Sequence, residues 1–570
     1  MEKGIKSLKW LYPALFLLFV AWTAVGAFPL VNYEGDSNAV LGNLTTLLAG
    51  GEFSPESYYA YDDQPLTYWL IAAVDRITPL GPEESYCLIC WLAMVWLAWL
   101  TVSIVHRLTS LSRCVILLAW WLMPESYACG MYANSAVAAT AVAMAGIWLL
   151  TRRRYLWSAT VLCIAPLLRM DIMCIYPVVF PLFCFLGMNW RRSLGVSALM
   201  AVAVAAVATV GLWLMGGNIL NNFGTYTFWN GLIEPVDRVK AIIGCYSIPG
   251  MLIIVAGLVM LFRRKEWLLA AVLLLPVVTE HLVYIKMGCA GKHFLYALPF
   301  AAGIASYAVA GIVEGVRRRR PAQMAIAVVV FLFETCYVVV PVWKTNLYEE
   351  LLPQDKKRVP RLRLFSFRIA GYEAQAGIGG GLWFGTADEI MLMSGNAVYP
   401  FAIHNLKAQF KDQEDEMLRF LEGKTDYVAV TVIYESYNRF IIALYNRGWR
   451  ISSEQTELAK VPGIWPVNYT MQTIDMTDGK GHLITVMQWG TITPHTHVGE
   501  PVKTADNEIT VFLKGLRTDG RPVYYIMPGY TAFVWDKYHE NLEAEHFLIP
   551  RAPAVWKLPD SLFKSLDDGR

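Results

Sequence analysis

The chain has 570 residues, of which 56% are hydrophobic and 16% charged, and its mean hydropathy is +0.40. Soluble domains are about 45–50% apolar, so this composition excludes an ordinary soluble protein and indicates an integral membrane protein. The net charge is +2 and no basic domain stands out, which argues against a nucleic-acid partner.

Apolar segments long enough to cross a bilayer, about 20 residues each, recur through the first 343 residues. They lie near residues 10–31, 84–105, 131–150, 171–188, 194–215, 242–262, 267–286, 293–314 and 321–342. Two shorter segments, 114–124 and 155–168, are needed for successive helices to alternate in direction. The first segment lacks a small-residue cleavage site near Phe28, so we expect an uncleaved span. The sequence predicts a multi-spanning α-helical membrane protein with about eleven transmembrane helices.

Lysine and arginine are unevenly distributed between the two sides that this topology defines. With the N-terminus in the cytoplasm, 17 basic residues before Lys344 fall on the cytoplasmic side and six fall elsewhere. The 17 are Lys3, Lys6, Lys9, Arg107, Arg113, Arg152 to Arg154, Arg191, Arg192, Arg263 to Lys265 and Arg317 to Arg320. Because cytoplasmic loops are enriched in basic residues, the first loop (32–83) and the C-terminal region are predicted to be extracytoplasmic. The absence of cysteine after Cys336 excludes a disulfide-stapled external domain and favours a bacterial cytoplasmic (inner) membrane.

The polar part of the chain begins near residue 344. Of the 46 acidic residues, 18 lie in residues 1–343 and 28 in the remaining 227. Residues 344–377 suit a linker or interfacial segment. Residues 378–465 alternate short apolar strands with helices and predict a small α/β lobe, and residues 466–570 predict a β-rich lobe of sandwich or barrel type.

The segment from Asn32 to Leu70 concentrates carboxylates in a region otherwise nearly free of them. Its acids are Glu34, Asp36, Glu52, Glu56, Asp62 and Asp63. A predicted helix runs from Asp36 to Ala49, a GGEF turn ends it, and QPLTYWL follows at 64–70. Ionisable groups held close to a membrane usually serve a site or a pathway, so this loop is the first place to look for function.

This loop resembles the first external loop of the GT-C glycosyltransferases, in their protein mannosyltransferase and aminoarabinose transferase branches. Leu168 to Asp171 (LRMD) and Gly291 to Pro299 (GKHFLYALP) resemble two further motifs of that family. The resemblance covers about residues 1–345. It implies a membrane enzyme that moves a sugar from a polyprenyl-phosphate donor to a lipid, glycan or protein acceptor, with inversion as the expected outcome.

Such a transfer needs a base for the acceptor hydroxyl and cations for the departing phosphate. The resemblance implies Asp36 as the base, with Glu34 in reserve; the alternative for Asp36 is a helix N-cap. It implies Arg169, Lys292 and His293 as ligands of the donor phosphate. The alternatives are that Arg169 and Asp171 pair only to hold the bundle together, and that Lys292 extends to the lipid headgroups.

Further residues are candidates for contacts with the sugar or acceptor. They are Asp62, Asp63, Gln64, Asp171, Tyr226 and Trp229. Relatives often carry Lys or His before a proline pair, whereas this chain has Gln64 and a single Pro65, which weakens the case for phosphate contact there. Asp62 and Asp63 could bind an amino-sugar, position the acceptor or ligate a divalent metal, although no cluster with ligand spacing accompanies them. Tyr226 and Trp229 either stack on a sugar or form an interfacial belt.

Two other classes of function compete with this interpretation. A transporter or flippase for a lipid-linked glycan would spread charges through the membrane midplane, whereas here they gather toward one side. A non-catalytic assembly protein would use its tail to bind glycan. In that tail, His495, His497 and Glu500 resemble a cupin metal motif with the wrong glycine spacing, so a surface turn without metal is predicted. The CxxC at Cys87 and Cys90 lies in an apolar helix and predicts packing.

Overall fold

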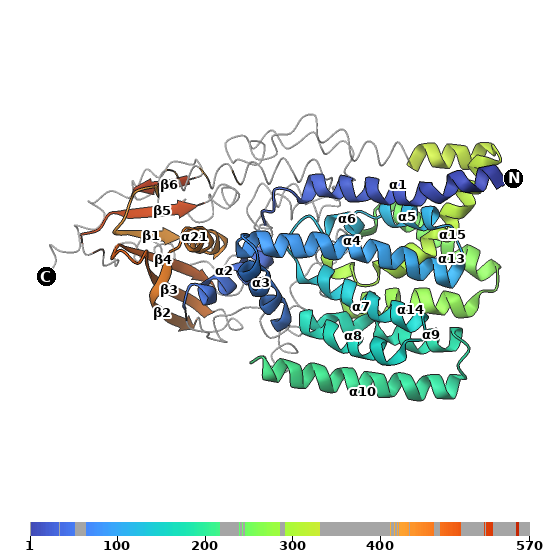
Figure 1. The fold of residues 1–570 in the computed structure, drawn as a ribbon, viewed down its shortest axis with the longest axis horizontal. Helices are drawn as coiled ribbons and strands as arrows, with labels where there is room; N and C mark the ends of the chain where they lie inside the picture. The colour runs from blue at the N-terminus through green and yellow to red at the C-terminus, as the bar shows by residue number, and fades with distance from the viewer. Residues whose placement is uncertain are drawn as a thin grey trace.

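The computed structural model describes residues 2–32, 35–51, 64–216, 245–284, 291–330, 421–431, 434–460, 468–491, 520–527 and 554–557, together with positions 239, 242, 411, 415, 419 and 518. In this part of the chain, a helical bundle built from residues before 331 lies end to end with an α/β unit built from residues after 420 (Figure 1). We call the end of the bundle next to the α/β unit the sheet end, and the opposite end the N-terminal end.

Apolar helices make up the bundle, as predicted. Five are long and apolar enough to cross a membrane: α1 (Glu2–Ala27), α4 (Pro82–Thr109), α10 (Trp190–Leu214), α14 (Trp267–Tyr284) and α15 (Leu298–Arg317). Shorter apolar helices are α7 (Ser135–Thr151), α8 (Tyr155–Leu168), η1 with α9 (Met170–Val178 and Val179–Phe185), α13 (Ile248–Arg263) and Pro321–Val330. With α5 (Arg113–Trp121), these helices overlap every apolar segment predicted above, so the predicted fold class is confirmed.

Tight turns at the N-terminal end of the bundle carry many of its arginines. Three residues separate α7 from α8, α13 from α14, and α15 from the helix Pro321–Val330, so each pair must run antiparallel. Arg153, Lys265 and Arg319 take positive φ in these turns. The basic segments that the sequence assigned to one side of the membrane therefore lie at one end of the bundle.

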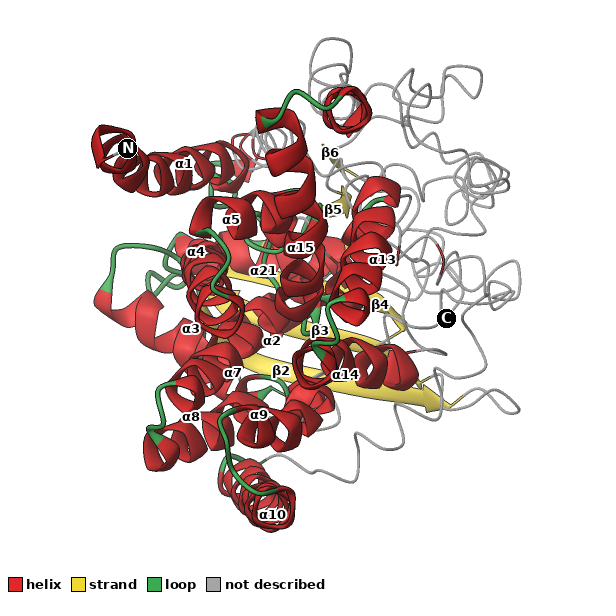
Figure 2. Cartoon of the chain, turned by 90° about the vertical axis from the view of Figure 1, so that its right-hand side faces the viewer, coloured by secondary structure: helices red, strands yellow, loops and turns green. Residues whose placement is uncertain are grey.

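Burial separates central helices from peripheral ones. In the most apolar 18-residue stretch of α15, 67% of the residues are buried, and in that of α4, 56%. The corresponding shares are 11% for α10 and 22% for α1. Figure 2, viewed along the bundle, shows α15 among α4, α5, α13 and α14, with α10 and α1 at the periphery. Trp190, Leu199 and Trp213 of α10 point outward and are largely exposed. An apolar outer surface suits contact with lipid, as expected of a multi-pass membrane protein.

The C-terminal unit contains one mixed sheet in the order β2-β3-β4-β1-β5-β6. Its strands are β1 (Tyr427–Thr431), β2 (Arg450–Lys460), β3 (Asn468–Thr477), β4 (Leu483–Thr491), β5 (Val523–Met527) and β6 (Ala554–Lys557). β1 runs parallel to both β4 and β5, and the other pairs are antiparallel.

This sheet differs from the separate sandwich or barrel expected for residues 466–570. β1 comes from the range 378–465, yet it lies between β4 and β5 of the later range, so the described strands form one open sheet. The physical reason is the composition of β1. Val428, Ala429 and Val430 are fully buried, and such a continuous apolar run stabilises a central strand with neighbours on both edges.

Two helices join the sheet to the bundle. In α21 (Tyr434–Asn446), Phe440 and Ile441 pack in the core of the sheet, whereas Ile442 packs in the core of the bundle. The first-loop helix α2 (Gly35–Leu48) packs on α21, and Ala49, directly after α2, is buried in the core of the sheet. Helix α2 therefore belongs to both units, and its bounds agree with the predicted helix 36–49.

Gly50 and Gly51 end α2 in the predicted turn. Gly50 takes φ +101°, a left-handed conformation that favours glycine at a helix C-terminus. At this turn the amide of Ile451 in β2 donates to the carbonyl oxygen of Ala49 at 2.8 Å. The turn therefore joins the first loop to the edge of the sheet.

Candidate active site

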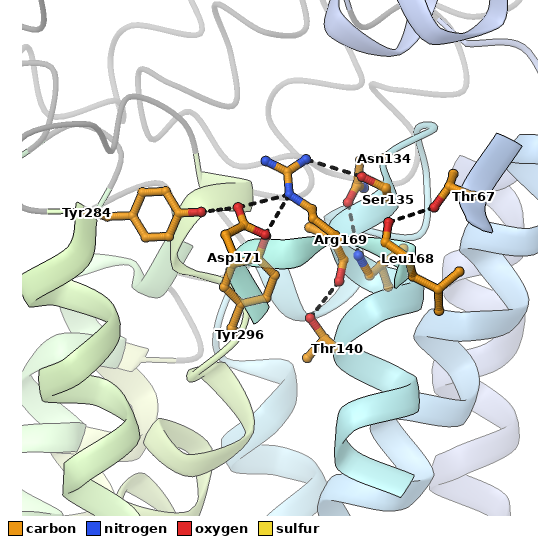
Figure 3. A network of polar contacts seen from close by, with 11 residues as sticks. Thr67, Asn134, Ser135, Thr140, Leu168, Arg169, Asp171, Tyr284 and Tyr296 are labelled. Atoms are coloured by element: carbon orange, nitrogen blue, oxygen red, sulfur yellow. Dashed lines mark hydrogen bonds and ion pairs between the residues drawn. The ribbon is translucent and has the colours of Figure 1, made fainter. Parts of the chain in front are cut away.

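Arg169 lies at the sheet end of the bundle, where α8 ends and η1 begins. Its Nε donates to both carboxylate oxygens of Asp171 at 3.0 Å, and its Nη1 donates to Ser135 Oγ at 3.2 Å (Figure 3). The carbonyl oxygen of Leu168 accepts a 2.8 Å hydrogen bond from Thr67 in α3 (Pro65–Ile77). A helix of the first loop is thus fixed directly beside the arginine.

Asp171 is held by two tyrosines as well as by Arg169. The Tyr296 hydroxyl donates to Oδ1 at 2.6 Å and the Tyr284 hydroxyl donates to Oδ2. The Asp171 side chain is 4% exposed, whereas that of Arg169 is 18% exposed. A buried carboxylate is costly unless it is paired and hydrogen-bonded, and here both of its oxygens are satisfied by protein donors. The predicted pair is therefore present, with its arginine the more accessible partner.

Tyr284 also connects this pair to the predicted cations of the last motif. Its ring stacks on the imidazole of His293, with centroids 5.4 Å apart and an interplanar angle of 4°. Lys292 precedes His293 in the short helix η2 (Gly291–Phe294) and is 5% exposed. A lysine that extends to the lipid headgroups would be exposed, so the burial of Lys292 contradicts that alternative.

The structure places Asp36 as the second residue of α2, and its side chain lies outside the described residues. Its neighbours along the chain are anchored to Ala133. The Ser37 hydroxyl donates to the Ala133 carbonyl oxygen, and Asn32 Oδ1 accepts from the Ala133 amide at 3.3 Å. Ala133 is two residues before Ser135, the partner of Arg169. The start of α2 and Arg169 are thus joined through one short segment.

Gln64 is the described member of the predicted substrate contacts in the first loop. It is 3% exposed, and its Oε1 has no hydrogen-bond partner among the residues that the structure describes. The other candidates, Glu34, Asp62, Asp63, Tyr226 and Trp229, lie outside the described residues, as do His495, His497 and Glu500. Within the described part of the chain, no group of three or more His, Cys, Asp or Glu residues is arranged to hold a metal.

The sequence interpretation missed Tyr284, Tyr296 and Ser135. Tyr296 lies inside the GKHFLYALP segment, and Tyr284 ends α14, so hydroxyl groups near the ends of apolar helices were the available signal. Glu280, one turn before Tyr284, is fully buried, and its Oε1 accepts from the Ala297 amide at 3.0 Å. This bond fixes the segment that carries Tyr296 and His293.

Comparison with solved structures identifies the fold. The chain is similar to the crystal structure of ArnT from Cupriavidus metallidurans in the apo state, with a TM-score of 0.55 and 14% identity over 97% of this chain and 99% of that chain. The chain has the GT-C-like fold of ArnT. A crystal structure of the same ArnT bound to undecaprenyl phosphate matches with a TM-score of 0.47 and 13% identity, over 76% of this chain and 84% of that chain. No protein-family model matches the sequence, and neither does any curated protein.

The ArnT-like fold agrees with the resemblance found in the first loop and the two later motifs. The similarity extends over both the bundle and the C-terminal unit, since it covers 97% of this chain. The motif resemblance was confined to about residues 1–345, so the comparison adds the C-terminal unit to the shared architecture.

Proposed function

We propose that the protein is a membrane glycosyltransferase that moves a sugar from a polyprenyl-phosphate donor to a lipid, glycan or protein acceptor. The observation that carries this proposal is the cluster of Arg169, Asp171, Tyr284 and His293 beside the start of α2 in a GT-C-like fold. The three segments that resemble GT-C motifs are distant in sequence, yet they supply residues to neighbouring positions at the sheet end. The donor class is proposed on that resemblance, and the fold shared with ArnT supports it.

The proposed reaction is a single displacement. The oxygen of the acceptor hydroxyl attacks the anomeric carbon of the sugar while Asp36 accepts the hydroxyl proton. The bond between the anomeric carbon and the phosphate oxygen breaks, and the polyprenyl phosphate leaves with both bonding electrons. One displacement inverts the anomeric centre, in contrast to the covalent double displacement of retaining enzymes.

Arg169 is proposed as the principal ligand of the departing phosphate, assisted by Lys292 and His293. A guanidinium binds phosphate through several N–H groups in a fixed plane, so its orientation matters. Asp171 accepts from the Nε edge and Ser135 accepts from Nη1, which fixes that plane. The greater exposure of Arg169 than of Asp171 supports a guanidinium that reaches a ligand while the carboxylate anchors it.

Gln64, Asp62, Asp63, Tyr226 and Trp229 are proposed to contact the sugar or the acceptor. Gln64 supports this part of the proposal because its buried Oε1 lacks a partner among the described residues, and buried amide groups normally have one.

The proposed orientation places the sheet end on the extracytoplasmic side of a bacterial inner membrane. The arginine-rich turns lie at the N-terminal end of the bundle, opposite the Arg169 cluster, and basic turns favour the cytoplasmic side. The site would then face the compartment that holds the C-terminal unit.

The test uses the purified full-length protein with a synthetic polyprenyl-phosphate sugar and a mixture of envelope lipids and glycans. We expect release of polyprenyl phosphate, followed by ³¹P NMR, together with a glycosylated acceptor of inverted configuration. Movement of the intact donor across proteoliposomes without cleavage would instead support the flippase. Binding of glycan with neither cleavage nor movement would support the assembly protein.

A further inference from the structure

We infer that Arg439, in the C-terminal unit, is a positioning residue that holds the start of α2, and hence Asp36, through Glu83. The catalytic consequence rests on the proposed function, whereas the positional claim can be tested without it. Arg439 is separated from Asp36 by most of the chain, and no motif pointed to it.

Two donors from distant parts of the chain meet at one carboxylate oxygen of Glu83. Arg439 of α21 donates through Nη1 to Oε1 of Glu83, at the beginning of α4. The same oxygen accepts a 2.6 Å hydrogen bond from the backbone amide of Asn32. The Arg439 side chain is 2% exposed and that of Glu83 is 11% exposed, so both charges are largely removed from water. The pair therefore has little freedom to rearrange.

Asn32 passes this constraint to the start of α2. Its Oδ1 accepts from the Ala133 amide at 3.3 Å, and the Ala133 carbonyl oxygen accepts from the Ser37 hydroxyl. Asn32, Ser37 and Ala133 are all buried. The segment from Asn32 to Ser37, which contains Asp36, is therefore anchored at both ends. A misplacement of about 1 Å in a reacting group can cost about 10²-fold in rate, so such anchoring has catalytic value.

Docking of the two units does not by itself explain a buried ion pair. Ile442 of α21 and Ala49 after α2 already supply apolar contacts between the units. Burying an ion pair costs desolvation energy, whereas burying apolar side chains does not. The best-supported role of such a pair is to select one geometry. Glu83 of this pair also binds the backbone amide of Asn32, four residues before Asp36. A fixed geometry at this position would serve the reaction.

Helix α21 also offers a matched control. The Tyr445 hydroxyl donates to Asp75 Oδ2 of α3 at 3.3 Å, which is a second hydrogen bond between the same two units. No hydrogen bond in the described structure connects Asp75 to Asn32 or Ala133. Removing the Tyr445 hydroxyl therefore weakens docking without releasing the start of α2.

The experiment compares full-length wild type with Arg439→Met, Arg439→Lys, Glu83→Gln and Tyr445→Phe. Hydrogen exchange followed by mass spectrometry reports on the amides of residues 29–41, and transfer assays give kcat and KM for the donor. We expect Arg439→Met and Glu83→Gln to speed exchange in this segment about tenfold or more, through local opening. We expect kcat to fall about 10²-fold with little change in KM, because positioning and not binding is lost. Arg439→Lys should recover part of both values, and Tyr445→Phe should match wild type.

Unchanged exchange at residues 29–41 in a folded Arg439→Met protein would overturn the inference. Equal effects from Tyr445→Phe would also overturn it, because Arg439 would then act only in docking. If Arg439→Met fails to fold, Glu83→Gln decides the claim, because unchanged exchange at residues 29–41 in that variant would equally overturn it. Faster exchange in these variants, combined with no sugar transfer by the wild type, would support the positional role while contradicting the proposed function.

Discussion

Arg169 presents its Nε edge to both carboxylate oxygens of Asp171 at 3.0 Å, and the same two oxygens accept from the tyrosines at positions 284 and 296. The carboxylate is almost fully buried, so each of these donors offsets part of its desolvation. The arrangement fixes the guanidinium plane and leaves part of the guanidinium accessible to a ligand, since the Arg169 side chain is 18% exposed. Its energetic consequences can be measured separately from catalysis.

Tyr284→Phe and Tyr296→Phe should each destabilise the protein by about 1.5–3 kcal/mol, because each removes a hydrogen bond to a charged group. Thermal unfolding in detergent measures the loss. Tyr246→Phe is the matched control, since the Tyr246 hydroxyl is buried without a hydrogen-bond partner among the described residues. That change should be neutral or slightly stabilising. Equal losses in all three variants would mean that the hydroxyls do not stabilise Asp171.

Arg169→Lys should weaken binding of undecaprenyl phosphate about 10-fold to 100-fold, since a point charge replaces an oriented guanidinium and about 1.5–3 kcal/mol is at stake. Calorimetric titration of the purified protein with this lipid measures the change. Arg152→Lys serves as the control because Arg152 lies at the N-terminal end of the bundle, 4.2 Å from the Trp148 ring centroid. Undiminished affinity in Arg169→Lys would leave the pair with a structural role only.

Asp36→Asn should lower kcat about 10²-fold to 10⁴-fold, the usual contribution of a general base, while donor binding stays near the wild-type value. Asparagine keeps the size and polarity of the side chain at the start of α2, so a purely structural role for Asp36 predicts little change in either rate or stability. Glu34→Gln is the paired variant, and we expect it to retain most activity. If Glu34→Gln loses activity while Asp36→Asn retains it, Glu34 is the base.

Local patterns were sufficient to predict much of this molecule. Apolar length predicted the spans, the helix from 36 to 49 agrees with α2, and the glycine turn after it is present. The pairing of Arg169 with Asp171, two residues apart, was also within reach of local reasoning. These features depend on neighbouring residues, whose propensities and periodicity are visible in a sequence.

Long-range pairing was not predictable in the same way. Tyr284 and Tyr296 reach Asp171 across 113 and 125 positions, and Arg439 reaches Glu83 across 356. Strands were predicted within residues 378–465, but nothing in the composition of β1 specified β4 and β5 as its neighbours. Tertiary packing selects such partners, and periodicity carries no information about them.

The pH dependence of stability should carry a signature of Asp75 at the contact between the units. Burial raises the pKa of Asp75 above its ordinary value of 3.8, although the Tyr445 hydroxyl bond opposes the shift. The folded state then binds this proton more tightly than the unfolded state, so stability falls as pH rises from 3.8 through the raised pKa. Asp75→Asn should remove that fall and stabilise the protein at pH 7, since the amide oxygen still accepts from Tyr445.

The contribution of Asp426 to stability should change with pH in the opposite direction, so Asp426 supplies the control for Asp75. The hydrogen bond from the Leu483 amide lowers the pKa of Asp426, so its stabilising effect is present above the ordinary value and is lost as pH falls. Asp426→Asn should therefore cost stability at pH 7 and little at acid pH. The loss falls below pH 3.8, so melting curves of both variants are recorded from pH 2 to pH 8. Parallel curves for the two variants would contradict the assignment.

Gly257→Ala should test the packing of α13 against α15. A Cβ at this position would overlap the Ile304 carbonyl oxygen, which is backbone and cannot rotate away, so the helices must separate. We expect a loss of about 1–3 kcal/mol from overpacking, which outweighs the gain of about 1 kcal/mol from replacing glycine in a helix. Gly195→Ala in α10 is the control, since no atom of the described residues outside its own helix lies within 4 Å of the added Cβ, and it should stabilise slightly. A melting temperature for Gly257→Ala at or above the wild-type value would show that α13 and α15 are not in close backbone contact.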